Sequence, residues 1–208
     1  MLEINYDLKY NIFGDVMKTV KCNSSNELII KNSRFITLLF KIENVLDVDR
    51  IFQNVKKEYP KATHYCYAYI INDYKKCSDD GEPGGTAGMP MLNVLEKENI
   101  LNVLAVTIRY FGGIKLGAGC LVRAYSKSVK QALEDAIMIE VEAGYLVKIN
   151  VSYEEQKNVD YILKKYTIVN KCYLQDITYE VLLPKASINV ISDYNYEIIA
   201  EKYIEKVL

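Results

Sequence analysis

The amino-acid sequence predicts an α+β fold in two domains. Three observations lead to this prediction: segments that alternate with the strand period of two, amphipathic segments with the helical period of 3.6, and a reset of the pattern around Met138–Gly144. With 208 residues, the chain is long enough to bury two separate cores. After the reset, the predicted order of elements is β-α-β-β-α-β, which is the order of a ferredoxin-like domain.

The first domain is expected to mix strands and helices. Segment 44–59 has the apolar spacing of an amphipathic helix, and Pro60 follows its end. Segment 64–71 alternates tyrosines with smaller residues, which is typical of a strand. The strands predicted for this domain are 27–30, 35–42, 64–71 and 102–110, and the helices are 44–59, 91–97 and 117–136.

The second domain is expected to follow the β-α-β-β-α-β order throughout. Its first helix, 154–166, is predicted from the spacing of Val159, Ile162 and Leu163. Pro184 is expected to open the second helix, since proline fits the first turn of a helix. The predicted strands are 145–153, 168–174, 177–183 and one near the C-terminus.

Composition and charge narrow the class of protein. Hydrophobic residues make up 50% of the chain and charged residues 25%, an ordinary balance for a globular protein. The net charge of −1 provides no global basic field, so any attraction to RNA has to come from a local patch. No segment reaches the roughly 20 apolar residues that span a bilayer, and the N-terminus lacks the apolar run of a signal peptide. Together these features predict a cytoplasmic protein that does not bind a membrane.

The cysteines and the single histidine, His64, do not form a metal-binding motif. None of the five cysteines is spaced Cys-x-x-Cys, and one histidine supplies too few further ligands. We therefore expect free thiols, as in a reducing compartment, and no zinc site. The cysteines are Cys22, Cys66, Cys77, Cys120 and Cys172.

Glycine is concentrated in two segments, 78–88 and 109–119, and the second of them predicts an anion site. There a predicted strand leads through closely spaced glycines into a helix, which brings unpaired backbone N–H groups and the positive end of the helix dipole together. Phosphate is the expected anion, although the spacing is not that of a P-loop. The alternative is that the glycines only let the helix pack closely on its sheet. The residues expected to bind the anion are Gly112, Gly113, Lys115, Gly117, Gly119, Arg123 and Lys127, and Lys130 continues the basic row.

The first glycine-rich segment contains three carboxylates, Asp79, Asp80 and Glu82. We expect them to cap backbone amides of a tight turn or to pair with Arg109 and Lys115. The alternative is that one or two of them hold Mg²⁺. All three are candidate residues of a ligand site.

His64 and Arg109 lie on strand faces whose other members are small, such as Cys66 and Ala105. We expect such a face to form the floor of a ligand site rather than a core face, which makes both residues candidates for ligand binding. The alternative for His64 is a hydrogen-bonded structural role. No neighbour in the sequence identifies it as a catalytic base.

Three long motifs, in the same order, resemble those of the YigZ/IMPACT family. Because they are long and contiguous, they are far more specific than an isolated glycine pattern. The motifs are ATHYCYAY (62–69), SDDGEPGGTAGMP (78–90) and RYFGGIKLG (109–117), and LVRAY (121–125) extends the match.

The resemblance implies a fold for each part of the chain. Residues 1–17 are expected to form an N-terminal extension, and 18–138 a domain like domain 2 of ribosomal protein S5. Residues 139–208 are expected to form a ferredoxin-like domain similar to domain V of elongation factor G, whose last two domains engage the ribosome. Eukaryotic members of the family restrain a kinase that controls translation initiation, but they carry an additional N-terminal domain that we do not expect in this chain.

Three functions are consistent with the sequence. The leading hypothesis is a protein that binds RNA, the ribosome or another phosphate-bearing ligand in translation or its regulation. The first alternative is a Mg²⁺-dependent phosphate-ester or nucleotide hydrolase that uses Asp79, Asp80 or Glu82. The second is a regulator that binds other proteins through an exposed apolar patch. No catalytic residue is identified, and no cofactor is expected unless Mg²⁺ binds.

Overall fold

The computed structural model describes residues 16–206, which belong to two compact units. The first unit ends at Glu140 and the second begins at Val141, so the boundary falls inside strand β7 (Met138–Val151). The predicted N-terminal extension lies outside the described residues except for Val16 and Met17. Each unit has its own sheet and its own core.

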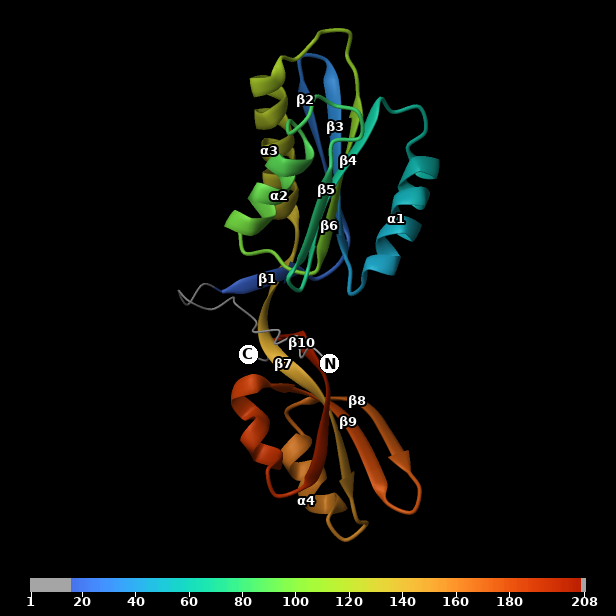
Figure 1. The fold of residues 1–208 in the computed structure, drawn as a ribbon, viewed down its shortest axis with the longest axis vertical. Helices are drawn as coiled ribbons and strands as arrows, with labels where there is room; N and C mark the ends of the chain where they lie inside the picture. Colours follow the sequence, from blue (N-terminus) through green and yellow to red (C-terminus); the bar gives the residue numbers. More distant parts are fainter. Residues whose placement is uncertain (1–15, 207–208) are drawn as a thin grey trace, which may run out of the picture. The chain divides into compact units, whose positions relative to one another are not determined.

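A five-stranded antiparallel sheet forms the centre of the first unit (Figure 1). Lys31 and Asn32 make the hairpin turn between its first two strands, and both have a positive φ, 45° and 66°. Two such residues in succession are typical of the tight turn that suits the twist of a hairpin. In spatial order the strands are β2 (Ser24–Ile30), β3 (Ser33–Lys41), β6 (Val103–Tyr110), β4 (His64–Ile71) and β5 (Tyr74–Ser78).

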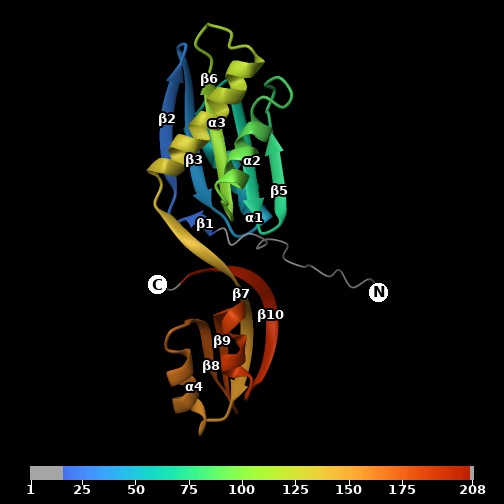
Figure 2. The same cartoon turned by 90° about the vertical axis from the view of Figure 1, so that its left-hand side faces the viewer.

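Three helices cover the two faces of this sheet. Helix α1 (Val45–Glu58) lies on one face, and α2 (Gly88–Lys97) and α3 (Ala118–Asp135) lie on the other, as Figure 1 and Figure 2 show. Asn44 caps α1, since its side-chain oxygen accepts a hydrogen bond from the backbone of Asp47 at 3.1 Å. The three predicted helices are confirmed, but α2 begins at Gly88 rather than at residue 91.

Two strands of the first unit are not among the sequence predictions. One is β5, whose central residues Lys75 and Lys76 interrupt the apolar alternation. The other is β1 (Met17–Val20), which lies beside the connection between α2 and β6. Lys18 N donates to Asn99 O at 2.9 Å, and Leu101 N donates to Lys18 O at 2.8 Å.

The face of the sheet under α1 holds a continuous apolar core. As the sequence predicts, the tyrosines of β4 share this face, and Tyr67 packs against Phe52 of α1 with ring centroids 5.3 Å apart. The buried members are Ile36, Leu38, Ile42, Val48, Val55, Tyr69, Ile71, Leu104, Val106 and Ile108.

The opposite face of the sheet is also buried, so the expectation that it forms the floor of a ligand site is wrong. Cys66, Ala105 and Thr107 on this face have no exposed surface. Thr37 Oγ1 on β3 hydrogen-bonds Thr107 Oγ1 at 2.8 Å and also Ser128 Oγ on α3. Small side chains let α2 and α3 approach the sheet closely, and paired hydroxyls can be buried at little cost. The small and polar composition of this face therefore reflects helix packing.

The second unit has the element order β-α-β-β-3₁₀-β. Its strands pair in the order β10 (Asn195–Glu205), β7, β9 (Ile177–Pro184) and β8 (Thr167–Tyr173), and every pair is antiparallel. Strand β1 of the first unit pairs with β7, the strand in which the boundary falls. The segment after Pro184 is a 3₁₀ helix, η1 (Lys185–Ile191), whereas the sequence predicts an α-helix there.

One face of the second sheet is covered by α4 (Gln156–Leu163) and η1. Asp160 on α4 ties this layer to the sheet, because its Oδ1 accepts hydrogen bonds from Lys171 Nζ and from Tyr179 Oη, each at 2.8 Å. The buried core residues are Val147, Ile149, Val151, Val159, Leu163, Ile177, Tyr179, Val181, Leu183 and Ile191.

Candidate ligand-binding site

Most of the site residues predicted from the sequence lie at one end of the first sheet. His64, at the start of β4, pairs in register with Arg109, near the end of β6. The two glycine-rich loops leave the sheet at this end, one between β5 and α2 and the other between β6 and α3. Long-range pairing of β4 with β6 thus brings the two loops together, although they are separated in the sequence by α2 and β6.

Asp79 holds the β5–α2 loop and the start of α2. Its carboxylate accepts backbone hydrogen bonds from Gly85 at 2.8 Å, Ala87 at 2.9 Å and Gly88 at 2.8 Å. Burial alone would raise the pKa of Asp79, but the three N–H donors together outweigh it and hold the pKa below its usual value. The side chain therefore acts as an ionised cap for α2, although it lies well before the helix in the sequence.

Asp80 has a similar role at the start of β4. Its Oδ2 accepts the backbone N–H of Tyr65 at 2.7 Å, and its carbonyl oxygen lies 2.9 Å from His64 Nδ1. Asp80 and the following Gly81 both have positive φ, 41° and 83°. These contacts join the β5–α2 loop to the first residues of β4.

Glu82 and Arg109 form a buried ion pair beneath the two loops. Arg109 Nη1 lies 2.6 Å from Glu82 Oε1, and their side chains are only 5% and 2% exposed. Tyr125 on α3 donates its hydroxyl to the same oxygen at 2.8 Å, and Ser33 Oγ accepts from Arg109 Nη2 at 3.4 Å. The pair thereby links the β5–α2 loop to β6, α3 and the start of β3.

His64 lies at the edge of this buried pair. Its Nε2 is 3.8 Å from Glu82 Oε2, and its side chain is 18% exposed. Gly81 passes close to the ring, because a Cβ on it would be 3.7 Å from His64 Nδ1. His64 therefore has the hydrogen-bonded structural environment that the sequence left as the alternative, and it keeps one edge open to solvent.

The neighbouring thiol is not suited to nucleophilic chemistry. Cys66 is fully buried, and its Sγ donates to Asp79 O at 3.0 Å and contacts Tyr125 Oη at 3.3 Å. Burial raises the pKa of the Cys66 thiol to about 12 and raises the pKa of Tyr125 as well. Both groups stay protonated near neutral pH and act as hydrogen-bond donors.

The carboxylates of the first loop are thus engaged in capping and in pairing with Arg109. Lys115, the other predicted partner, has no ion-pair partner within residues 16–206. Over the same residues, no group of three or more His, Cys, Asp or Glu side chains is placed to hold a metal ion. The hydrogen bonds of Asp79 and Asp80 and the ion pair of Glu82 are the contacts that the capping and pairing interpretation predicts.

The β6–α3 loop, in contrast, faces solvent. Its backbone N–H groups from Gly113 to Gly119 make no hydrogen bond with the described part of the chain. Gly113 has a φ of 82°, Lys115 and Gly117 are exposed, and Gly117 supplies no side-chain cap to α3. Such a loop leaves backbone donors available at the positive end of a helix.

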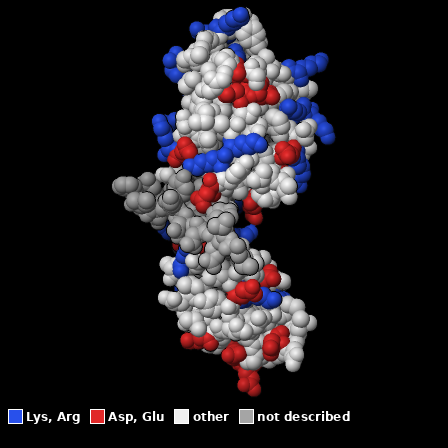
Figure 3. Space-filling model, in the orientation of Figure 1, with Lys and Arg blue, Asp and Glu red and all other residues white. Residues whose placement is uncertain are grey.

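The basic row on α3 extends the same exposed surface. Arg123, Lys127 and Lys130 lie on the solvent side of the helix, and within residues 16–206 none of them has an ion-pair partner. Arg123 is next to the loop, since a Cβ on Gly119 would be 3.7 Å from its Nη1. Figure 3 shows Lys and Arg side chains around this end of the first unit, near a group of Asp and Glu side chains.

The predicted site residues therefore separate into two groups. His64, Asp79, Asp80, Glu82 and Arg109 belong to the largely buried group, and the residues from Gly112 to Lys127 form the exposed one. Ser33 connects them, because its Oγ also accepts the backbone N–H of Gly112 at 3.2 Å. Ser33 and Tyr125 are not among the site residues predicted from the sequence. No local signal marks Ser33, whereas the hydroxyl of a buried tyrosine indicates that a polar partner is needed.

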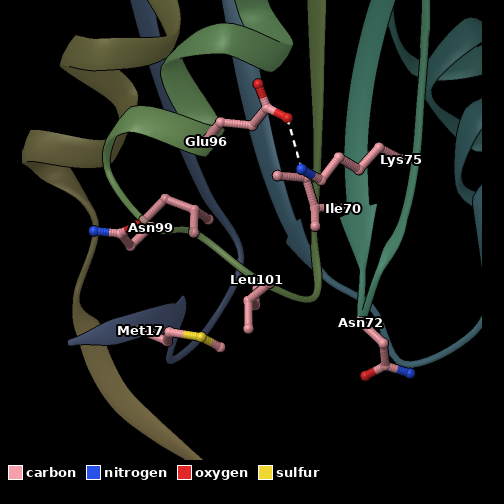
Figure 4. A pocket seen from close by; sticks show the side chains of 8 residues that line it. Met17, Ile70, Asn72, Lys75, Glu96, Asn99 and Leu101 are labelled. Carbon is pink, nitrogen blue, oxygen red and sulfur yellow. Dashed lines mark hydrogen bonds and ion pairs between the residues drawn. The ribbon is translucent and has the colours of Figure 1, made fainter. Parts of the chain in front are cut away.

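A separate hollow lies at the opposite end of the first sheet (Figure 4). Ile70 pairs with Val103 at that end, whereas His64 pairs with Arg109 at the other. Two of its lining residues, Lys75 and Glu96, form an ion pair of 2.7 Å. None of the predicted site residues lines it; its lining consists of Met17, Ile70, Asn72, Lys75, Glu96, Asn99, Ile100 and Leu101.

Comparison with known proteins identifies relatives along most of the chain. The family model of the Impact N-terminal domain matches residues 31–133. The IMPACT family member YvyE of Bacillus subtilis is 37% identical over 185 residues, which is 86% of this chain and 85% of that protein. YigZ of Escherichia coli is 35% identical over 76% of this chain and 81% of its own length. A crystal structure of a hypothetical protein has a TM-score of 0.67 and 29% identity, and the match covers 90% of this chain and 99% of the other.

The fold and the site define a two-unit α+β protein with an exposed cationic loop and helix at one end of its first sheet. The relatives show that the chain belongs to the IMPACT family, as its sequence motifs predict. None of the helices over residues 16–206 combines the length and the apolar character needed to cross a membrane.

Proposed function

We propose that this IMPACT-family protein binds RNA, free or within the ribosome, and that it acts in translation or its regulation. The single observation that carries the proposal is the exposed surface of the β6–α3 loop and α3. There Lys115, Arg123 and Lys127 have no partner in the described chain, next to unpaired backbone N–H groups. Cations without internal partners are available to phosphate groups, and free N–H groups at a helix start favour the same ligand. Translation is the proposed context because the family resemblance implies it.

We also assign the two units to the fold classes that the resemblance implies. For the second unit, the fully antiparallel order β10-β7-β9-β8 and the β-α-β-β-3₁₀-β sequence of elements support a ferredoxin-like domain. For the first unit, the assignment to a domain like domain 2 of ribosomal protein S5 is supported by the three family motifs, all of which lie within it.

Fluorescence anisotropy with a labelled RNA tests the proposed function. The double variant Arg123→Ala, Lys127→Ala is expected to weaken binding about tenfold at low salt. It should also reduce the slope of log affinity against log salt by about 1.4, since each lost phosphate contact on a single strand contributes about 0.7. The control, Lys18→Ala with Lys97→Ala, removes two exposed cations from the opposite end of the first sheet and should bind as the wild type does.

Two outcomes would contradict the proposal: no affinity of the wild type for RNA at about 50 mM salt, or equal affinity of both double variants.

We propose in addition that binding needs no metal or cofactor. The carboxylate contacts of Asp79, Asp80 and Glu82 within the protein support this, because their oxygens already accept hydrogen bonds. Affinity that disappears on chelation with EDTA would count against it.

A further inference from the structure

An exposed aromatic side chain lies at the start of the cationic loop. Phe111 is 46% exposed, and Ile114 three residues later is exposed to the same extent. Lys115 follows them and is exposed as well. Exposed aromatic surface beside a free cation is the combination with which proteins bind single-stranded nucleic acid, the ring stacking on a base and the cation contacting a phosphate.

The ring of Phe111 is supported from the inside by the buried ion pair. The guanidinium carbon of Arg109 lies 5.7 Å from the centre of the Phe111 ring and 5.4 Å from that of Phe35. Arg109 is only 4% exposed, Phe35 is fully buried, and Glu82 holds the guanidinium at 2.6 Å. Because Arg109 is buried and Phe111 is partly exposed, the guanidinium contacts the ring from the protein side, and the exposed part of the ring faces solvent.

The backbone of Phe111 is held as firmly as its ring. Thr63 Oγ1 accepts the Phe111 N–H at 3.0 Å, and Ser33 Oγ accepts the next N–H, that of Gly112, at 3.2 Å. Gly112 is pressed against the β2–β3 turn, where a Cβ would lie 2.1 Å from the carbonyl carbon of Asn32. The ring therefore loses little conformational freedom when a ligand stacks on it.

We infer that the RNA ligand is single-stranded and that one of its bases stacks on Phe111. The inference rests on the proposed function and adds the class of RNA to it. The N–H groups from Gly113 to Gly119 and the side chain of Lys115 then bind the phosphates that flank the stacked base. Every base has a face that can stack on an aromatic ring, so this contact is tolerant of sequence. In a duplex the bases stack on one another, and only the phosphates would be reached.

Anisotropy with a single-stranded RNA of about 12 nucleotides, and with a duplex of the same length, tests this inference. Phe111→Leu keeps an apolar side chain but removes the ring. It should weaken single-strand binding about tenfold, leave duplex binding unchanged, and leave the salt slope unchanged because no cation is lost. Phe111→Trp should restore the affinity. Tyr74→Leu is the matched control, since Tyr74 is 53% exposed but lies where β4 and β5 meet, at the other end of the sheet.

A second readout follows the stacked base directly. With 2-aminopurine in the single strand, wild-type protein should quench the fluorescence on binding, and Phe111→Leu should not. Equal single-strand affinity of Phe111→Leu and wild type, with the Arg123 and Lys127 double variant still weakened, would overturn the stacking and leave the proposed function intact. Absence of wild-type binding to either RNA would overturn both.

Discussion

Glu82 and Arg109 stabilise the fold directly, and they contribute to the proposed binding surface only through the residues that they support. Their buried ion pair joins four segments that are distant in the sequence, and it supports the ring of Phe111 from beneath. Two desolvated charges are stable together only while each has its partner. Among the residues that the sequence analysis assigned to a ligand site, Glu82 and Arg109 thus support the proposed binding surface from beneath and are not part of it.

Glu82→Gln is expected to lower the free energy of unfolding by about 3 kcal/mol, because it leaves the Arg109 charge buried without a countercharge. Urea denaturation followed by circular dichroism would measure the change. Glu27→Gln is the matched control, since it removes a carboxylate from the exposed pair with Arg34 and should have little effect. A loss no larger than that of Glu27→Gln would contradict the structural role assigned to Glu82.

Asp79 leads to a prediction on pH. Its folded-state pKa lies below the usual 3.8, so its contribution to stability is fully present above about pH 4 and is lost as the pH falls through the folded-state pKa. Asp79→Asn should therefore destabilise the protein by about 2 kcal/mol at neutral pH, and the difference from wild type should shrink towards pH 3. Thermal unfolding of both proteins across this range checks the prediction; a difference independent of pH would refute it.

At the scale of elements, the hydrophobic pattern of the sequence is sufficient to predict most strands and helices, but it does not predict a few of them correctly. The periods of two and 3.6 identify β4, β6, α1 and α3, because each buries a full face or stripe. The pattern does not identify β5, because this strand lies at the edge of the sheet, pairs with β4, and has two lysines where apolar residues would alternate. After Pro184, where the sequence predicts an α-helix, the segment needs only one buried residue, Ile191, and a 3₁₀ helix suffices.

The β6–α3 loop depends on its glycines to different degrees. Gly112→Ala should move the loop away from the β2–β3 turn, cost about 2 kcal/mol or more and weaken RNA binding, because the new Cβ would overlap the backbone of Asn32. Gly117→Ala is the control: apart from its chain neighbours, no heavy atom would lie within 4 Å of the new Cβ, so stability should fall by no more than about 1 kcal/mol, the difference between glycine and alanine at a helix N-cap. Chemical denaturation and anisotropy measure both effects, and equal tolerance of the two substitutions would show that Gly112 is not tightly packed.

At the scale of the whole molecule, the chain contains two separate cores, one in each compact unit. The overall charge of −1 gives the chain no global attraction to nucleic acid, so the proposed binding relies on the local surface of the first unit.

Two cores also predict two unfolding transitions in calorimetry. Leu104→Ala removes a fully buried side chain from the first core, and Leu183→Ala removes one from the second. Each should destabilise its own unit by about 2–5 kcal/mol and lower only one of the two transition temperatures. A single transition that both substitutions lower equally would show that the units unfold together.

The sequence by itself determined the class of fold, the family, and the two glycine-rich loops as the segments of interest, because periodicity and motifs are local properties of the chain. Tertiary structure alone decided what the charged residues do. Glu82 meets Arg109 across 27 residues and Tyr125 across 43, and nothing local specifies which carboxylate is buried with which cation. The pairing of β4 with β6 and the packing of α3 make that choice, since a buried charge is tolerated only where the fold brings its partner within hydrogen-bond distance.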